Sequence, residues 1–198
     1  MPLLSRYGAV WGLEPSATLA SRAAGRGAAL GVHQADFFHH DIDPRVNLFC
    51  LFDVLEHIEH DEQFVKRLVD AAARDHLLLL SVPACQFLFG PHDRILHHYR
   101  RYSRRGITEL LQKHGYEIVQ SGYFMCLLFP LAVLSRFIER LKARLGIGHS
   151  DVNMGRVGRP LNWVFTKTLE LEAVFGRFVQ FPIGLWVVVL ARRKSDSR

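Results

Sequence analysis

The side chains best suited to chemistry follow an apolar run that ends at an acid. Residues 48–52 are apolar throughout, and Asp53, Glu56 and His57 come directly after them. Carboxylates and imidazoles can take a proton from a substrate, and the same groups can bind a metal ion. The alternative is structural: the two acids favour the N-terminus of a following helix, and the histidine lies in solvent.

A second polar set lies in residues 84–102, which we interpret as a loop. Its members are acids, bases or anion-binding groups, namely His92, Asp93, His97, His98, Arg100, Arg101 and Tyr102. Histidine titrates near neutral pH, and arginine pairs with carboxylates and phosphates. The set therefore suits an acceptor-binding loop, and the alternative is a solvated basic loop.

The elements around both sets predict a parallel sheet. Residues 48–52 and 76–82 are typical of strands buried on both faces, and residues 61–69 carry their apolar side chains on one helical face. Strands joined through a helix run parallel, and open α/β sheets bind ligands at the carboxyl ends of their strands. Both polar sets follow such ends, where loops carry function.

Two further short strands also end in acids. Residues 9–13 are followed by Glu14, and residues 32–35 by Asp36. An acid in this position can accept hydrogen bonds from both hydroxyls of a ribose. The remaining predicted elements are a helix capped by Ser103 and ended by Gly115, a strand at 116–123, a helix at 161–175 and a closing strand at 181–191.

Composition favours one globular domain. The chain has 198 residues, 49% of them hydrophobic and 22% charged. A net charge of +6 favours an anionic substrate or an anionic membrane, whereas nucleic acid fits least, since no zinc-finger or RNP-type motif is present. Cys50, Cys85 and Cys126 are odd in number and far apart, which predicts free thiols in a reducing compartment. No secretion signal is visible, so we expect a cytoplasmic protein.

Residues 127–145 predict an amphipathic helix. Leucine or isoleucine recurs every three or four residues, at Leu127, Leu131, Leu134, Ile138, Leu141 and Leu145, and the polar face is rich in arginine and lysine. Two interpretations stay open. Such a helix can cover a core, or it can lie on an anionic membrane surface and make the protein peripheral there.

Taken in order, these residues resemble the class I S-adenosylmethionine-dependent methyltransferases of the small-molecule type. The matching stretches are residues 10–16, 53–58, 78–83 and 181–185, and residues 92–103 match one subgroup. The resemblance implies a Rossmann-like α/β fold with helices on both faces of the sheet. It implies seven strands in the order 3-2-1-4-5-7-6, with the last strand antiparallel.

The resemblance also implies functional roles. Glu14 would bind the ribose of S-adenosylmethionine, Asp36 would lie near its adenine, and Phe52 and Asp53 would lie beside its methionine portion. The candidate catalytic residues are His57, His92, Asp93 and His97. One of the three histidines would act as the base, and Asp93 would orient it. The candidate acceptor-binding residues are Arg100, Arg101 and Tyr102.

We expect no metal ion, but one alternative is kept. Some quinone-pathway O-methyltransferases carry an acid-x-x-Glu-His set that holds a divalent cation. The set formed by Asp53, Glu56 and His57 is similar to it.

The sequence departs from the family at its start. The family has a glycine-rich loop after its first strand, and this sequence begins in what should be the following helix. We therefore expect one methyltransferase-like domain over residues 1–198, truncated at the N-terminus, with a helical insertion at about 124–178. The expected function is methyl transfer to a small-molecule or lipid acceptor, although residues 1–198 by themselves should bind the cofactor poorly. The alternatives are a non-catalytic relative and a peripheral membrane-binding module.

Overall fold

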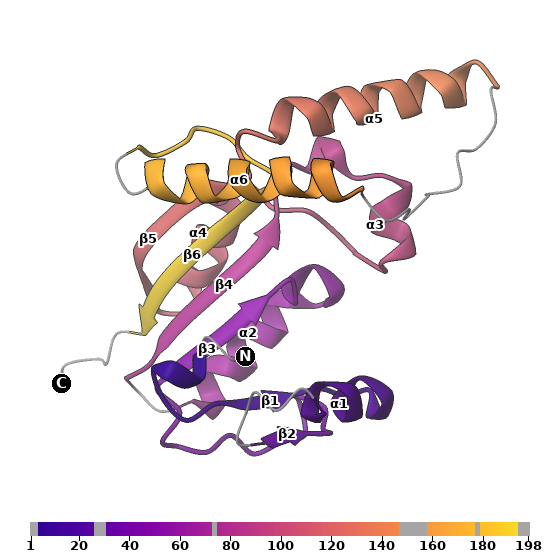
Figure 1. Ribbon diagram of the computed structural model, residues 1–198. Helices are drawn as coiled ribbons and strands as arrows, with labels where there is room; N and C mark the ends of the chain where they lie inside the picture. Colours follow the sequence, from indigo (N-terminus) through magenta and orange to yellow (C-terminus); the bar gives the residue numbers. More distant parts are fainter. Residues whose placement is uncertain (1–3, 26–30, 73–74, 147–157, 177–178, 194–198) are drawn as a thin grey trace. The chain divides into compact units, whose positions relative to one another are not determined.

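The computed structural model describes the chain except residues 1–3, 26–30, 73–74, 147–157, 177–178 and 194–198 (Figure 1). It divides into two compact units, Met1–Asp43 and Pro44–Arg198. Each unit is described by itself below.

The first unit is built on two short parallel strands. It contains the single 3₁₀ turn η1 (Leu4–Arg6), β1 (Trp11–Leu13), α1 (Ala17–Ala24) and β2 (Gly31–His33). Ser16 caps α1, and its hydroxyl accepts a hydrogen bond from the Leu19 amide. The Glu14 amide donates to the His33 carbonyl, which extends the β1–β2 pairing by one bond. Glu14 therefore follows β1 directly, as predicted, whereas β2 ends at His33, three residues before Asp36.

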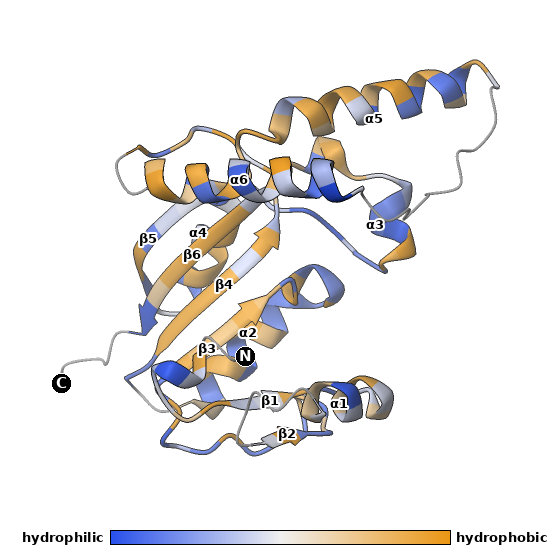
Figure 2. Ribbon diagram, viewed as in Figure 1, coloured by the Kyte–Doolittle hydropathy of each residue, from blue (hydrophilic) through white to orange (hydrophobic). Residues whose placement is uncertain are grey.

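The second unit contains a four-stranded sheet. Its strands are β3 (Leu48–Phe52), β4 (Leu77–Pro83), β5 (Tyr116–Phe124) and β6 (Trp186–Arg193), in the order β3-β4-β6-β5. β3 and β4 are parallel, and β6 is antiparallel to both of its neighbours. β3, β4 and β6 are hydrophobic along most of their length (Figure 2).

Two helices contribute most of the helical side chains in the core. α2 (Asp61–Ala71) and α4 (Arg104–Lys113) each bury one face, as their spacing predicted. Ser103 caps α4 through a bond from the Gly106 amide. The buried residues of these helices and of the central strands are Phe64, Val65, Leu68, Leu78, Leu80, Val82, Ile107, Leu111, Val187, Val189 and Ala191.

The strand orders are those implied by the methyltransferase resemblance. In the first unit β2 and β1 correspond to strands three and two, and in the second unit β3, β4, β6 and β5 correspond to strands four, five, seven and six. Within the described residues β1 pairs only with β2, and β3 pairs only with β4. β3 is consequently less buried than its apolar sequence predicted, and Phe52 at its end is exposed.

The remaining helices of the second unit lie between its strands in the sequence. They are η2 (Leu55–His57), η3 (Gln86–Leu88), α3 (Pro91–Ile95), α5 (Phe129–Arg144) and α6 (Arg159–Phe175). η3 and α3 give regular structure to the segment predicted as a loop. α5 buries none of its residues, so the interpretation that it covers a core is not supported. None of the helices in the described part of the chain combines the length and hydrophobicity that a membrane-spanning segment needs.

The closing strand is shorter than predicted, because residues 181–185 stay outside it. Gly184 explains this difference. A β-carbon placed on Gly184 would lie 2.6 Å from the Phe124 carbonyl oxygen and 2.8 Å from the Cys126 sulfur. The chain therefore passes the end of β5 in direct backbone contact before β6 begins at Trp186.

Candidate active site

The candidate site lies at the carboxyl edge of the second unit's sheet, which we define as the edge where β3 and β4 end. Phe52 pairs with Ser81, and Pro83 pairs with Trp186, the first residue of β6. The segments that follow β3 and β4 therefore leave the sheet at the same edge. This placement confirms that the two polar sets follow neighbouring strand ends.

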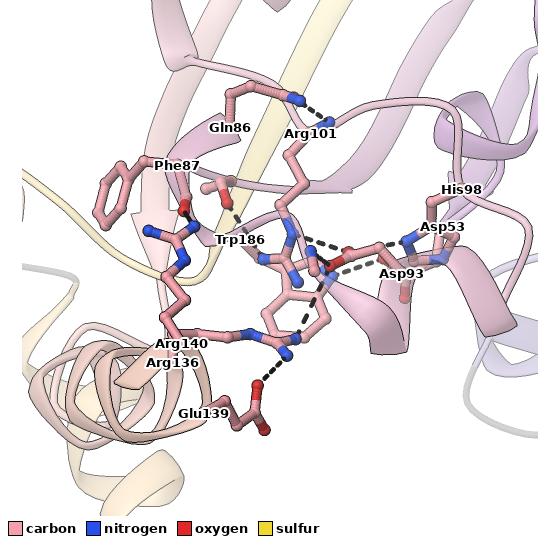
Figure 3. Close-up of polar contacts among 12 residues, drawn as sticks. Asp53, Gln86, Phe87, Asp93, His98, Arg101, Arg136, Glu139, Arg140 and Trp186 are labelled. Atoms are coloured by element: carbon pink, nitrogen blue, oxygen red, sulfur yellow. Dashed lines mark hydrogen bonds and ion pairs between the residues drawn. The ribbon is translucent and has the colours of Figure 1, made fainter. Parts of the chain in front are cut away.

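Asp53 turns the chain sharply as β3 ends. Its φ of 54° lies in the left-handed region, where aspartate is tolerated better than most residues. Its carboxylate accepts a 2.6 Å hydrogen bond from the indole nitrogen of Trp186 (Figure 3). Phe52 and Asp53 are both exposed, which leaves them accessible to a ligand. Their contact with the methionine portion of a cofactor stays a prediction.

Glu56 is a buried carboxylate without a hydrogen-bond partner. Its exposed fraction is 0%, and neither carboxylate oxygen has a partner among the described residues. Burial raises its pKa to about 7, and the negative charges of Asp53 and Asp93 act in the same direction. The backbone of Glu56 itself and, more weakly, the charge of Arg101 oppose the rise. A group this costly to bury is unusual unless it has a function.

Two histidines lie next to Glu56. The rings of His57 and His98 are 4.6 Å apart between centroids and nearly perpendicular. Burial lowers the pKa of His57, and His98 lowers it further. One ligand atom from each of Glu56, His57 and His98 lies within 4.8 Å of the others, and we name this group the Glu–His–His cluster.

The Glu–His–His cluster differs from the metal set that the sequence suggested. That set was Asp53, Glu56 and His57, but Asp53 is not within the same reach of the other two. Its carboxylate is directed instead to Trp186. His98 takes its place, although nothing in the local spacing of the sequence singles it out from the neighbouring histidines.

Asp93 organises the segment that follows β4. Its carboxylate is fully buried and accepts hydrogen bonds from the Gly90 amide at 2.9 Å and from Arg101 Nε at 2.8 Å (Figure 3). It lies 3.2 Å from His98 Nδ1 and 3.7 Å from the guanidinium of Arg136 in α5. Burial alone would raise the pKa of Asp93, but Arg101 and the Gly90 amide hold it below its usual range.

The histidine that contacts Asp93 is His98, which is not one of the three bases that the sequence suggested. A role for Asp93 in orienting a catalytic base stays a prediction. His92 lies within α3, and His97 is exposed with a φ of 59°. Neither has a ligand atom in the Glu–His–His cluster. A catalytic role for His92 or His97 stays a prediction.

The three predicted acceptor-binding residues differ in accessibility. Arg101 donates to Asp93 and to the Ala84 carbonyl, and the Tyr102 hydroxyl donates to Asp61 at 2.7 Å. Arg101 and Tyr102 are nearly buried and hold the segment in place through these bonds. Their contact with an acceptor stays a prediction. Arg100 pairs with Asp61 at 2.8 Å but keeps 31% of its side chain exposed. It is the member of the three that can still meet a ligand.

The two acids of the first unit have local partners. The Glu14 carboxylate accepts from the Ser16 amide at 3.0 Å. Asp36 accepts from the Phe38 amide at 3.3 Å and lies 2.6 Å from His39 Nδ1. Each carboxylate has spare acceptor capacity. Binding of ribose by Glu14 and of adenine by Asp36 stays a prediction.

Comparison with solved structures identifies the fold. The chain is similar to an S-adenosylmethionine-dependent methyltransferase from Mesorhizobium loti, with 13% identity, coverage of 96% of this chain and 84% of that one, and a TM-score of 0.59. It is similar to magnesium protoporphyrin IX methyltransferase from Synechocystis, solved with bound S-adenosylhomocysteine, with 13% identity, coverage of 98% and 68%, and a TM-score of 0.54.

The [4+2]-cyclase SpnF is also similar, with 15% identity, coverage of 93% of this chain and 66% of that one, and a TM-score of 0.52. No family model and no curated protein matches the sequence. The chain thus has the fold of the class I S-adenosylmethionine-dependent methyltransferases. The similar proteins differ in what they act on, and a cyclase is among them, so the fold does not by itself specify the reaction.

Proposed function

We propose that the protein transfers a methyl group from S-adenosylmethionine to a small-molecule or lipid acceptor. The observation that carries this proposal is the position of Asp53, the Glu–His–His cluster and Arg100 after neighbouring strand ends of a methyltransferase-type sheet. Ligands of open α/β sheets bind at this edge. A similar structure from Synechocystis contains S-adenosylhomocysteine, the product that such a reaction leaves.

The cofactor is assigned to acids that follow strands. The Glu14 carboxylate accepts hydrogen bonds from the ribose hydroxyls, and Asp36 lies beside the adenine. In the second unit, Phe52 and Asp53 meet the methionine portion. Asp53 is held by Trp186 in a left-handed conformation, which fixes the direction of its carboxylate.

Methyl transfer is an in-line displacement. A lone pair of the acceptor forms a bond to the methyl carbon while the bond from that carbon to sulfur breaks, and S-adenosylhomocysteine leaves. The reaction gains most from holding the two reactants in line. The acceptor's proton passes to a base, for which His57, His92 and His97 are candidates. Arg100 carries a positive charge that suits an anionic acceptor.

Kinetics of labelled-methyl transfer test the acceptor side of this proposal. Arg100→Ala and His97→Asn should lower turnover with an anionic acceptor at least tenfold and leave the affinity for S-adenosylmethionine unchanged. Asparagine is chosen at position 97 because it tolerates the positive φ. Arg94→Ala is the control, since Arg94 is an exposed arginine of the same segment.

Equal losses of turnover and cofactor affinity in Arg100→Ala would show that the segment after β4 does not face the acceptor. No labelled product from any acceptor, with intact cofactor binding, would favour the non-catalytic alternative.

The surface of α5 favours a second candidate function, binding to an anionic membrane. Arg136 and Arg140 lie on the side of α5 that contacts the protein, where they meet Asp93 and the Phe87 carbonyl. With 3.6 residues per turn, Leu134 and Leu141 fall on the opposite side. Both are exposed, Leu134 to 54%. Basic residues flank this apolar stripe, which suits anionic lipid headgroups.

Flotation of the whole chain with lipid vesicles tests this second function. The protein should bind vesicles that contain phosphatidylglycerol, release from them as salt is added, and bind phosphatidylcholine vesicles weakly. The double change Leu134→Glu and Leu141→Glu should abolish flotation, whereas Val119→Glu, at an exposed apolar residue of β5, should not. Equal flotation of both variants would exclude α5 as the membrane contact.

A further inference from the structure

Glu56 carries a buried carboxylate whose hydrogen-bonding capacity is not satisfied. Both of its oxygens are buried, and neither has a hydrogen-bond partner among the described residues. Burying an ionised carboxylate without a partner is strongly unfavourable. Such a group is accommodated either by taking a proton or by binding a cation, and the neighbouring side chains distinguish these possibilities.

The neighbours of Glu56 are metal-binding groups. One nitrogen each from His57 and His98 lies within 4.8 Å of a carboxylate oxygen of Glu56, and the two nitrogens lie within the same distance of one another. Protein nitrogen and oxygen ligands lie at about 2.0–2.2 Å from zinc, so two ligands of one ion are at most about 4.4 Å apart. A small inward movement of the side chains is therefore enough to close the site.

The surroundings of His98 point the same way. Its Nδ1 lies 3.2 Å from the buried Asp93 carboxylate, which leaves Nε2 as the free nitrogen. A metal-bound histidine almost always donates its other ring N–H to a carboxylate, a carbonyl or water. Asp93 is itself fixed by Arg101 and Gly90, so it can hold the His98 ring in a fixed orientation.

We propose that the Glu–His–His cluster binds one divalent transition-metal ion of the zinc class. The ligands are a carboxylate oxygen of Glu56 and one imidazole nitrogen each from His57 and His98. Two imidazoles and a carboxylate suit zinc and its neighbours better than magnesium or calcium, which prefer oxygen ligands. Asp53 and Asp93 add negative charge nearby, whereas the charge of Arg101 is paired with Asp93.

Three protein ligands leave a coordination position open, as in catalytic zinc sites. If methyl transfer is the function, this position can take an acceptor oxygen and favour loss of its proton. This consequence rests on the proposed function, but metal binding does not.

Calorimetry on the chain, freed of any polyhistidine tag and treated with a chelator, tests the site with Zn²⁺ as the probe. The wild type should bind one ion, and Glu56→Gln and His98→Gln should each weaken binding at least tenfold. His60→Gln is the matched control, because His60 is an exposed histidine three positions from His57. It should bind as the wild type does.

Two further measurements keep the test decisive. Circular dichroism shows whether each variant is folded, and Co²⁺ in place of Zn²⁺ gives visible absorption bands that report nitrogen and oxygen ligands directly. These bands should disappear in folded His98→Gln. Absence of saturable Zn²⁺ binding by the wild type, or wild-type affinity in both folded variants, would overturn the proposal. Failure here would leave methyl transfer untouched, since labelled-methyl kinetics measure it separately.

Discussion

Asp93 shows how one side chain can fix a whole segment. It joins the start of α3, the end of the segment after β4, and α5 through Gly90, Arg101 and Arg136. All of these contacts are made by a carboxylate without solvent exposure. Removing one partner of a buried ion pair leaves the other charge without compensation, which costs far more than an exposed pair contributes.

Asp93→Ala should therefore destabilise the protein by about 3–5 kcal/mol, since it leaves Arg101 nearly buried and without its carboxylate. The free energy of unfolding from urea denaturation measures this. Asp70→Ala, at an exposed acid of α2, should change stability by less than about 0.5 kcal/mol. Similar values for the two variants would mean that Asp93 has no structural role.

At the residue scale, the place of the polar residues after the strands could be predicted, but the residues that each of them contacts could not. An acid after an apolar run placed Asp53 and Glu56 at a strand end, because the end of such a run is visible in the sequence. That Glu56 is buried while Asp53 is exposed depends on the turn of η2. That Asp93 selects His98 depends on the short helix α3, which five residues of ordinary composition did not reveal.

Elements were predicted well where periodicity was strong. The caps of α4 and the apolar runs of β3 and β4 follow from local sequence. The start of β6 was placed five residues too early, because residues 181–185 are apolar but pack against the end of β5. The exposure of α5 was also beyond prediction, since an amphipathic pattern does not say whether its apolar face is covered.

Gly184 gives a test at this scale. Gly184→Ala should destabilise the protein by about 1–3 kcal/mol, because the added methyl group would meet the Phe124 carbonyl oxygen at 2.6 Å. Gly122→Ala is the control, since a β-carbon on Gly122 meets no atom within 4 Å. Thermal unfolding of both variants compares them. A Gly184→Ala variant as stable as the Gly122→Ala variant would contradict the close approach of residues 181–185 to β5.

At the scale of the whole molecule, strand order carries the functional argument. Each of the two sheets follows the order of the methyltransferase fold, and each places its acids after strand ends. The order could be anticipated from the resemblance, because it follows from which segments are strands. The division into two units reflects strand pairing between distant segments: among the described residues β1 pairs only with β2, and β3 only with β4.

Equilibrium dialysis of labelled S-adenosylmethionine against the protein is the most direct test of a methyltransferase function. We predict saturable binding that Glu14→Gln weakens by about 1–3 kcal/mol, the range for a hydrogen bond to a charged group. Glu117→Gln, at an exposed acid of β5, should leave it unchanged. No saturable binding, or full affinity in Glu14→Gln, would contradict the account.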